Sequence, residues 1–404
     1  MTAHSSGYLA KARSYLSTLC NVKPNRRTGS PGNWEATEFF GATVRGFGFE
    51  TDMTPFDTLD HVNEGPVLTM GAESFEVLTS PYSVGCDVSA ELIAVSSLEE
   101  LESSDCAGKI LLMRGPICAE QLMPKGFVFY NPDHHQRIIS LLESKSPAAI
   151  ITATQKSPDQ VGALDPFPLI VDGDFDLPSV YCRDAVGESL SQLRGSTMHL
   201  EIKARRFPAK ATNVIASLMR GHSRKVVLTA HIDAYEDTPG ASDNASGTVV
   251  LLLVAEMLST YRGECGIEIV ALNGEDHYSA GGQMDYLSRY GGQFPMICLA
   301  INVDDVGYEE GRSAYSFYGC PGELERKARA AFDGFGGLCQ GEQWFQGDHM
   351  IFVQNEVPCI AFTAELMREL MKTITHTALD TPAVVACRKL VEVARSLEAL
   401  IRSL

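Results

Sequence analysis

The spacing of hydrophobic positions changes along this chain and divides it into three parts. In the first part, hydrophobic residues recur at helical intervals over residues 8–20, which predicts an amphipathic helix. The dipeptide Ser30-Pro31 predicts the start of a second helix, because serine caps helices and proline fits their first turn. That helix is expected to end near Gly46 or Gly48.

The second part, from about residue 55 to residue 205, has a β-type pattern. Short runs such as 67–69 and 109–113 alternate with clusters of turn residues. One helical stretch over 136–142 precedes a strand at 148–152. This pattern predicts a separate, small, β-rich domain.

In the third part, from about residue 212, short apolar strands alternate with helices. The expected strands are 226–229, 267–272, 297–301 and 359–362, and the expected helices are 248–258 and 383–401. The 248–258 segment is apolar on nearly every side, which is typical of a buried helix. Strands that alternate with helices predict an α/β sheet covered on both faces.

Composition limits the partners that this chain can have. The 404 residues are 45% hydrophobic and 21% charged, which is an ordinary globular balance with room for two domains. The net charge of −18 argues against a nucleic-acid partner and against docking on an anionic membrane. No apolar run approaches the length of a transmembrane helix, and the N-terminus lacks a secretory signal pattern. Eleven cysteines without a CxxC pair predict reduced thiols in a cytoplasmic protein.

Histidine and acidic residues follow three predicted strands of the third part. In chain order these residues are His231, Asp233, Glu275, Asp276, Asp304 and Asp305. Ligands bind beyond the carboxyl ends of the strands in open α/β sheets, so these side chains are expected at one edge. Asp243 precedes the apolar helix, and His376 comes late in the chain.

Each of these residues also has an ordinary structural explanation. A single histidine after a strand is usually a loop residue, and Asp243-Asn244 could cap the helix that follows. Adjacent carboxylates, however, repel one another unless a cation or a proton lies between them. Histidine with carboxylate oxygens suits zinc in a catalytic site. The residues alone leave both interpretations open.

Five short blocks occur in a fixed order between residues 231 and 381. They are His-x-Asp, Gly-Ala-x-Asp-Asn-Ala-Ser-Gly, Gly-Glu-Asp, Asn-x-Asp-x-x-Gly and His-Thr-x-x-Asp-Thr. In this order they resemble the M28 family of zinc peptidases. The stretch from Thr28 to Gly32 resembles the start of that family's catalytic domain, and the runs 106–112 and 176–180 resemble a protease-associated insert.

The resemblance implies a three-layer α/β/α core with a mixed, mainly parallel sheet and a smaller β-rich inserted domain. The catalytic domain would be discontinuous, comprising 1–54 and 206–404, and the protease-associated-like insert would cover 55–205. The resemblance further implies a centre of two zinc ions.

The resemblance also implies a role for each metal ligand. Asp243 would bridge two zinc ions, His231 and Asp304 would complete one site, and Asp276 with His376 would complete the other. The family most often has Glu where this chain has Asp276. The shorter side chain leaves another divalent ion open at that position.

Two further acidic residues have roles implied by the same resemblance. Glu275 would be the general base that takes a proton from a metal-bridging water, and Asp233 would hydrogen-bond the ring of His231. Asp380 would act similarly near His376. Thr375 stands where some relatives carry an oxyanion-stabilising tyrosine, so that role must fall elsewhere or be absent.

The function expected from these residues is a two-zinc exopeptidase, an aminopeptidase that hydrolyses the N-terminal residues of short peptides. A single-zinc glutaminyl-cyclase-like acyltransferase is one alternative, and a non-catalytic receptor-like protein is another. Retention of His231 and Asp304 disfavours the cyclase, and the complete ligand set disfavours the receptor. A carboxypeptidase and a homo-oligomer both stay open.

Several other residues have more than one interpretation. Gly347-Asp348-His349 resembles a block near the site in this family, and Trp344-Phe345 before it could line a substrate pocket or belong to the core. His277 could compete for metal or be a bystander. The pair His134-His135 has no acidic partner pattern and is expected at the surface.

Overall fold

The computed structural model describes residues 3–156 and 161–404 and divides the chain into two compact units. The larger unit comprises Met1–Thr58 and Lys210–Leu404, and the smaller unit comprises Leu59–Ala209. The boundaries of these units lie close to those of the domains expected from the sequence. That each unit is a separate folding domain stays a prediction. Met1 and Thr2, where the search for a signal pattern began, lie outside the described residues.

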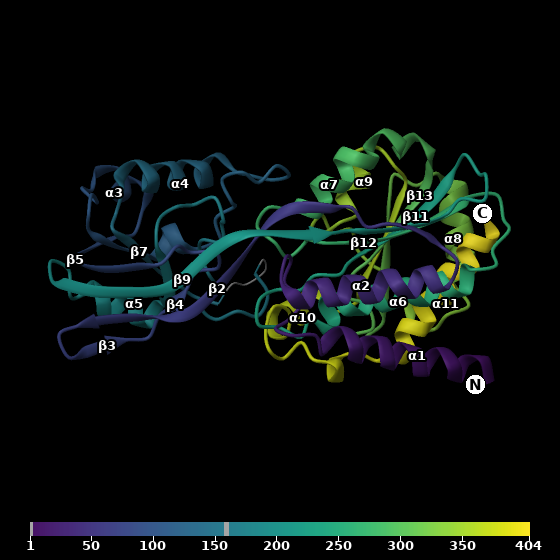
Figure 1. The fold of residues 1–404 in the computed structure, drawn as a ribbon, viewed down its shortest axis with the longest axis horizontal. Helices are drawn as coiled ribbons and strands as arrows, with labels where there is room; N and C mark the ends of the chain where they lie inside the picture. The colour runs from purple at the N-terminus through teal and green to yellow at the C-terminus, as the bar shows by residue number, and fades with distance from the viewer. Residues whose placement is uncertain (1–2, 157–160) are drawn as a thin grey trace. The chain divides into compact units, whose positions relative to one another are not determined.

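The larger unit contains an eight-stranded mixed sheet in the order β1-β10-β12-β11-β13-β16-β14-β15 (Figure 1). Its strands are β1 (Glu50–Asp52), β10 (Val214–Leu218), β11 (Lys225–His231), β12 (Gly266–Leu272), β13 (Ile297–Val303), β14 (Ser313–Tyr318), β15 (Leu338–Gln340) and β16 (Cys359–Ala364). The four central strands β12, β11, β13 and β16 are parallel. Antiparallel pairs flank them on both sides.

Helices cover both faces of this sheet, as Figure 1 shows. One layer contains α1 (Ala3–Cys20), α2 (Pro31–Gly46), α6 (Gly247–Leu258), α8 (Gly322–Phe332) and α11 (Cys387–Ser403). The other contains α7 (Gly281–Tyr290) and α9 (Met350–Val353), and α10 (Met367–Thr373) follows β16. The expected three-layer α/β/α fold is confirmed.

The local sequence explains two of these helices. Ser30 caps α2, accepting a hydrogen bond from the backbone N–H of Asn33 at 3.1 Å, and Pro31 begins the first turn. Within the described residues, the stretch Ala241–Leu258 is apolar and long enough to cross a membrane, but 94% of it is buried inside the protein. The apolar character of α6 therefore reflects its central place in the core.

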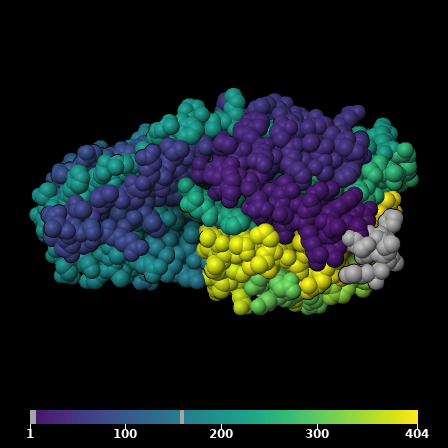
Figure 2. Space-filling view, turned by 60° about the horizontal axis from the view of Figure 1, so that its bottom comes forward, coloured from purple at the N-terminus to yellow at the C-terminus, as the bar shows by residue number. Residues whose placement is uncertain are grey.

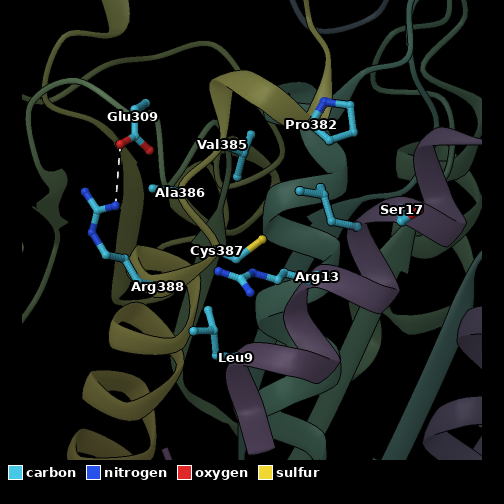
Figure 3. Close-up of a pocket in the computed structure, with 10 residues that line it drawn as sticks. Leu9, Arg13, Ser17, Glu309, Pro382, Val385, Ala386, Cys387 and Arg388 are labelled. Carbon is cyan, nitrogen blue, oxygen red and sulfur yellow. Dashed lines mark hydrogen bonds and ion pairs between the residues drawn. The ribbon is translucent and has the colours of Figure 1, made fainter. Parts of the chain in front are cut away.

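Helix α1 packs against α11, and the two helices lie side by side in Figure 2, in purple and yellow. A pocket of about 540 Å³ opens where α1 meets the start of α11 (Figure 3). Arg13 lines this pocket, as does an ion pair in which Nη1 of Arg388 lies 3.4 Å from Oε1 of Glu309. None of the seven expected catalytic and metal-binding residues is among the residues that line it.

The smaller unit has its own eight-stranded sheet, in the order β3-β2-β9-β5-β6-β7-β8-β4. Its strands are β2 (Pro55–Met70), β3 (Glu73–Phe75), β4 (Leu78–Thr79), β5 (Cys86–Val95), β6 (Ile110–Arg114), β7 (Ala149–Thr154), β8 (Ser179–Arg183) and β9 (Thr197–Thr212). Its helices are α3 (Leu98–Ser103), α4 (Asp133–Lys145) and α5 (Asp184–Ser191). The unit is β-rich as expected, and its kinship to protease-associated domains stays a prediction.

Candidate metal centre

Five candidate ligands converge beyond the carboxyl ends of β11, β12 and β13. Nε2 of His231 lies 3.0 Å from Oδ1 of Asp243 and 3.4 Å from Oδ1 of Asp304. Nε2 of His376 lies 3.0 Å from Oδ2 of Asp243 and 2.9 Å from Oδ1 of Asp276. The two oxygens of Asp243 therefore face two different histidines, and the five side chains form two groups that share this carboxylate.

The geometry and the unmet hydrogen-bonding capacity of these side chains fit a metal ion. Zinc binds nitrogen and oxygen at about 2.0–2.2 Å, so two tetrahedral ligands lie about 3.3 Å apart. The observed separations range from 2.9 to 3.4 Å. Among the described residues, Nε2 of His231, Oδ2 of Asp276 and Oδ1 of Asp304 are buried without a hydrogen-bond partner. Buried polar atoms are normally paired, so this cluster matches the donor set of a bound cation.

The electrostatics of the protein alone point the same way. Burial lowers the pKa of His231, but Asp304 and the other adjacent carboxylates outweigh it and raise that pKa well above its ordinary value. Burial and the charge of Asp243 raise the pKa of Asp276. Burial and the charges of Asp243 and Asp304 likewise raise the pKa of Asp305. The site thus concentrates negative charge that a bound cation would neutralise.

Glu275 lies next to these ligands and has a free carboxylate. It makes no side-chain hydrogen bond or ion pair with any described residue, and it is partly exposed. Burial raises its pKa well above the ordinary value; Asp276 and Asp304 add to this effect, while His231 opposes it. The position and the free carboxylate suit a group that exchanges protons with a bound molecule.

Asp233 connects His231 to the acidic pair. Its Oδ1 lies 3.6 Å from Nδ1 of His231, which is longer than a hydrogen bond. Its Oδ2 accepts hydrogen bonds from the hydroxyl of Thr28 at 2.9 Å and from the backbone N–H of Asp276 at 3.1 Å. The backbone N–H of Glu275 also points to Oδ1, at 3.4 Å. Asp233 therefore orients the backbone of both acidic residues in addition to standing beside the ring.

Asp380 contacts a different ligand from the one expected. Its Oδ1 accepts a hydrogen bond from the backbone N–H of Ser242 at 2.7 Å, and its Oδ2 accepts one from the N–H of Asp243 at 3.1 Å. It thus holds the turn that carries Asp243, whereas His376 stacks on Tyr235 with ring centroids 4.6 Å apart. Burial raises the pKa of Asp380 to about 7.

A buried arginine that the sequence did not single out supports the same turn. The guanidinium group of Arg26 donates to the carbonyl oxygens of Ile232 at 2.9 Å, Pro239 at 2.8 Å and Gly240 at 2.7 Å. Gly240 has φ of +59°, and a Cβ there would lie 2.6 Å from the carbonyl oxygen of Asp243. Only glycine fits this position.

The block Gly347-Asp348-His349 also borders the centre. A Cβ at Gly347 would lie 3.6 Å from Oδ2 of Asp304. Gln283 donates to the buried carboxylate of Asp348, and Nε2 of His349 lies 2.9 Å from the carbonyl oxygen of Trp344. Burial raises the pKa of Asp348 to about 7 and lowers that of His349 to about 4. The side chains of Asp348 and His349 are therefore both held by neighbouring residues at the border of the centre.

The structure shows the surroundings of two further residues, Phe345 and His277. Phe345 is 65% exposed, so it is not part of the core. The ring nitrogens of His277 lie 3.3 Å from the hydroxyl of Thr58 and 2.9 Å from that of Ser279. Both nitrogens of His277 thus have hydroxyl partners.

Glu120, His134 and His135 form a second group of potential ligands, in the smaller unit. His134 is exposed, as expected, but the expectation is wrong for His135, which is buried. Both histidines also have an acidic partner, because Oε1 of Glu120 lies 2.9 Å from Nε2 of His134 and 3.3 Å from Nε2 of His135. The backbone N–H of Met123 donates to Nδ1 of His135 at 3.1 Å. A neutral ring then carries its proton on Nε2, which leaves no lone pair for a metal.

Comparisons with known proteins agree with this geometry. Residues 213–401 match the model of peptidase family M28. The "Probable lipoprotein aminopeptidase LpqL" of Mycobacterium tuberculosis is 24% identical, and the match covers 72% of this chain and 57% of the relative. An aminopeptidase of Pseudomonas aeruginosa is 23% identical, with 82% and 65% covered. This chain thus spans less than two thirds of the length of either curated relative.

The fold is shared with solved structures. A zinc aminopeptidase from Bacillus subtilis has a TM-score of 0.76 at 19% identity, with 98% of this chain and 95% of that chain covered. Glutaminyl cyclase structures share the fold at a lower TM-score of 0.53.

Proposed function

Because residues 213–401 match the model of peptidase family M28, we propose that this protein is a metal-dependent aminopeptidase that works with two zinc ions. The observation that carries the proposal is the placement of Asp243, whose Oδ1 and Oδ2 each lie 3.0 Å from a different histidine nitrogen. A carboxylate shared in this way can belong to two metal sites at once. With His231 and Asp304 on one side and Asp276 and His376 on the other, each site has three protein ligands.

The ions would supply Lewis-acid chemistry, polarising the scissile carbonyl group and lowering the pKa of a water molecule. The chain's own contribution is to hold the reacting groups in place. Asp380 positions Asp243 by accepting a hydrogen bond from its backbone N–H, and Asp233 stands beside the ring of His231. Since Asp276 has a short side chain, another divalent ion at that site is part of the proposal.

Glu275 is the general base of the proposed reaction. Its carboxylate has no partner among the described residues, so it can take a proton from the attacking water and deliver it to the leaving amine. Asp233 keeps this carboxylate near the ligands by bonding the backbone of Glu275 and Asp276. The base is thereby positioned by the same residue that lies beside a metal-binding histidine.

The proposed substrates are short peptides with a free N-terminus. The relatives from Mycobacterium tuberculosis and Pseudomonas aeruginosa are both named aminopeptidases, which supports this choice over a carboxypeptidase. A cytoplasmic location and a homo-oligomeric state stay predictions.

The cyclase alternative is disfavoured by the completeness of the centre. A single-zinc transferase would use Asp, Glu and His ligands at one metal and would not need His231 and Asp304 placed together. Here Nε2 of His231 lies 3.4 Å from Oδ1 of Asp304, beside the shared Asp243. The same complete set disfavours a non-catalytic receptor.

The deciding experiment measures metal content and hydrolysis on the same protein samples. Wild type and Glu275→Gln are purified, reconstituted with zinc, and analysed for metal per chain by elemental mass spectrometry. Both are then tested on a panel of aminoacyl chromogenic substrates and on a peptide with N-terminal glutamine. We expect about two metals per chain in both proteins and a loss of hydrolysis by about 10²–10⁴-fold in the variant.

The other outcomes lead to different conclusions. A wild type that binds no metal on reconstitution overturns the proposal and leaves the receptor-like protein. One metal per chain with pyroglutamate formation supports the cyclase. Two metals with full hydrolysis by Glu275→Gln would assign the general base to another residue.

A further inference from the structure

Two thiols touch at the edge of the sheet that lies opposite the metal centre. The sulfur of Cys265, just before β12, lies 3.4 Å from the sulfur of Cys298 in β13. Among the described residues, this is the only pair of cysteine sulfurs in hydrogen-bonding contact. We propose that Cys265 and Cys298 are a reversible modification site, which a low-molecular-weight disulfide converts from a dithiol to a disulfide.

A disulfide would have to pass over β11, which lies between β12 and β13 in the sheet and whose Lys225 carbonyl oxygen is 3.2 Å from the Cys298 sulfur. Lys225 of β11 pairs with Ile297, while the next residue, Val226, pairs with Leu299. Cys298 is therefore the extra residue of a β-bulge and is not held by a partner in the ladder. A disulfide has a sulfur–sulfur distance of about 2.05 Å, so the sulfurs must approach by about 1.4 Å from 3.4 Å.

A small reagent can reach both sulfurs. The two cysteines line a surface pocket of about 250 Å³ together with Arg224, Glu323 and Lys327. Cys298 is half-buried, and Cys265 is 8% exposed. Burial raises the pKa of the Cys298 thiol to about 12, so little thiolate is present at neutral pH and we expect the exchange to be slow there and faster at alkaline pH.

The chemistry balances as two thiol–disulfide exchanges. The Cys298 thiol loses its proton and attacks one sulfur of the reagent, which releases one reagent thiol and leaves a mixed disulfide. The Cys265 thiol then loses its proton and attacks the Cys298 sulfur, releasing the second reagent thiol. Two protein thiols are oxidised, and one reagent disulfide is reduced to two thiols.

This site is independent of the proposed hydrolysis. β11 and β12 each contain seven residues, and the metal ligands follow their carboxyl ends while the thiols lie at the amino ends. At about 3.3 Å per residue, the two places are about 20 Å apart. We therefore expect closure of the disulfide to leave metal content and kcat unchanged.

The test uses the full chain with oxidised glutathione as the probe. After incubation, free thiols are alkylated, the protein is digested without reduction, and peptides are identified by mass spectrometry. We expect a cross-linked peptide pair containing Cys265 and Cys298, a loss of two of the eleven free thiols, and complete reversal by dithiothreitol. The wild-type result alone decides the question if a variant fails to fold.

Matched variants identify the attacking and resolving thiols. Cys265→Ser should stop at a mixed disulfide on Cys298, while Cys298→Ser should give neither product. Cys320→Ser removes a thiol whose sulfur lies 3.2 Å from the carbonyl oxygen of Cys359, and it should still cross-link fully. A wild type that keeps all its thiols, or that accumulates only the mixed disulfide on Cys298, overturns the proposal.

Discussion

The carboxylate of Asp380 holds the backbone of Asp243, with Oδ2 3.1 Å from the Asp243 nitrogen. Replacing Asp380 with Asn leaves one oxygen for the N–H groups of Ser242 and Asp243 and turns an amide toward the other. We expect metal affinity or kcat/KM to fall by about 10–100-fold, as for other partners of metal ligands. Chelator competition and steady-state kinetics measure the two effects. The exposed Asp333→Asn serves as the control, and an unchanged Asp380→Asn would contradict the positioning role.

Asp243 and Asp276 should differ in how many metals they control. Asp243 faces both histidines, whereas Asp276 lies 2.9 Å from His376 alone. We expect Asp276→Ala to lose about one of two metals and Asp243→Ala to bind both weakly, because only Asp243 belongs to both groups. Elemental analysis after equilibrium dialysis gives the ratio. Equal losses in the two variants would argue against a shared carboxylate.

Phe345 should affect substrate preference and not stability. Its ring is 65% exposed and lies 6.1 Å, edge to face, from that of Tyr318, next to the loop that borders Asp304. We expect Phe345→Ala to lower kcat/KM about tenfold for bulky apolar N-terminal residues and little for alanine. The free energy of unfolding should change by less than about 0.5 kcal/mol. Met284→Ala, on another exposed apolar residue, is the control.

His349 should make stability depend on pH. Burial lowers its pKa to about 4, below the ordinary value of 6.5, so the unfolded chain binds a proton more readily than the folded one. Stability should therefore fall as the pH drops from about 6.5 towards 4, by up to about 3 kcal/mol. Urea unfolding at pH 7 and pH 5 measures the loss. His349→Gln keeps a donor for the Trp344 carbonyl and should show a smaller loss than wild type, and an equal loss would refute the assignment.

The central strands and the ligands could be predicted from the sequence because both depend on short local patterns. β12 and β13 are apolar except for Glu268 and Asn302, and parallel pairing brings the residues after them to one edge. β14 was not predicted, because Ser313–Tyr318 mixes serine with aromatic residues. It is neither a continuous apolar run nor a regular alternation of apolar and polar residues. The last helix begins at Cys387, four residues after the predicted start, because Pro382–Val384 forms a separate turn.

The supporting contacts of the centre could not be predicted, because they join residues far apart in the chain. Nothing near Arg26 indicates that its guanidinium group bonds three carbonyl oxygens more than 200 residues away. The partner of Asp380 was misplaced for the same reason, since its carboxylate accepts hydrogen bonds from the backbone of Ser242 and Asp243, which lie far from it in the sequence. Burial of His135 likewise depends on tertiary packing that its neighbours in sequence do not reveal.

The hydrogen bonds of Arg26 to Ile232 and Gly240 can form only late in synthesis, because these partners are translated long after it. It leaves the ribosome before the smaller unit, Leu59–Ala209, and before the carbonyl groups of Ile232 and Gly240 that it bonds. Domains generally fold as units while the chain is still emerging. The smaller unit is therefore translated in full before the N-terminal helices can bond these partners. The candidate centre can be complete only once His376 and Asp380 have been translated.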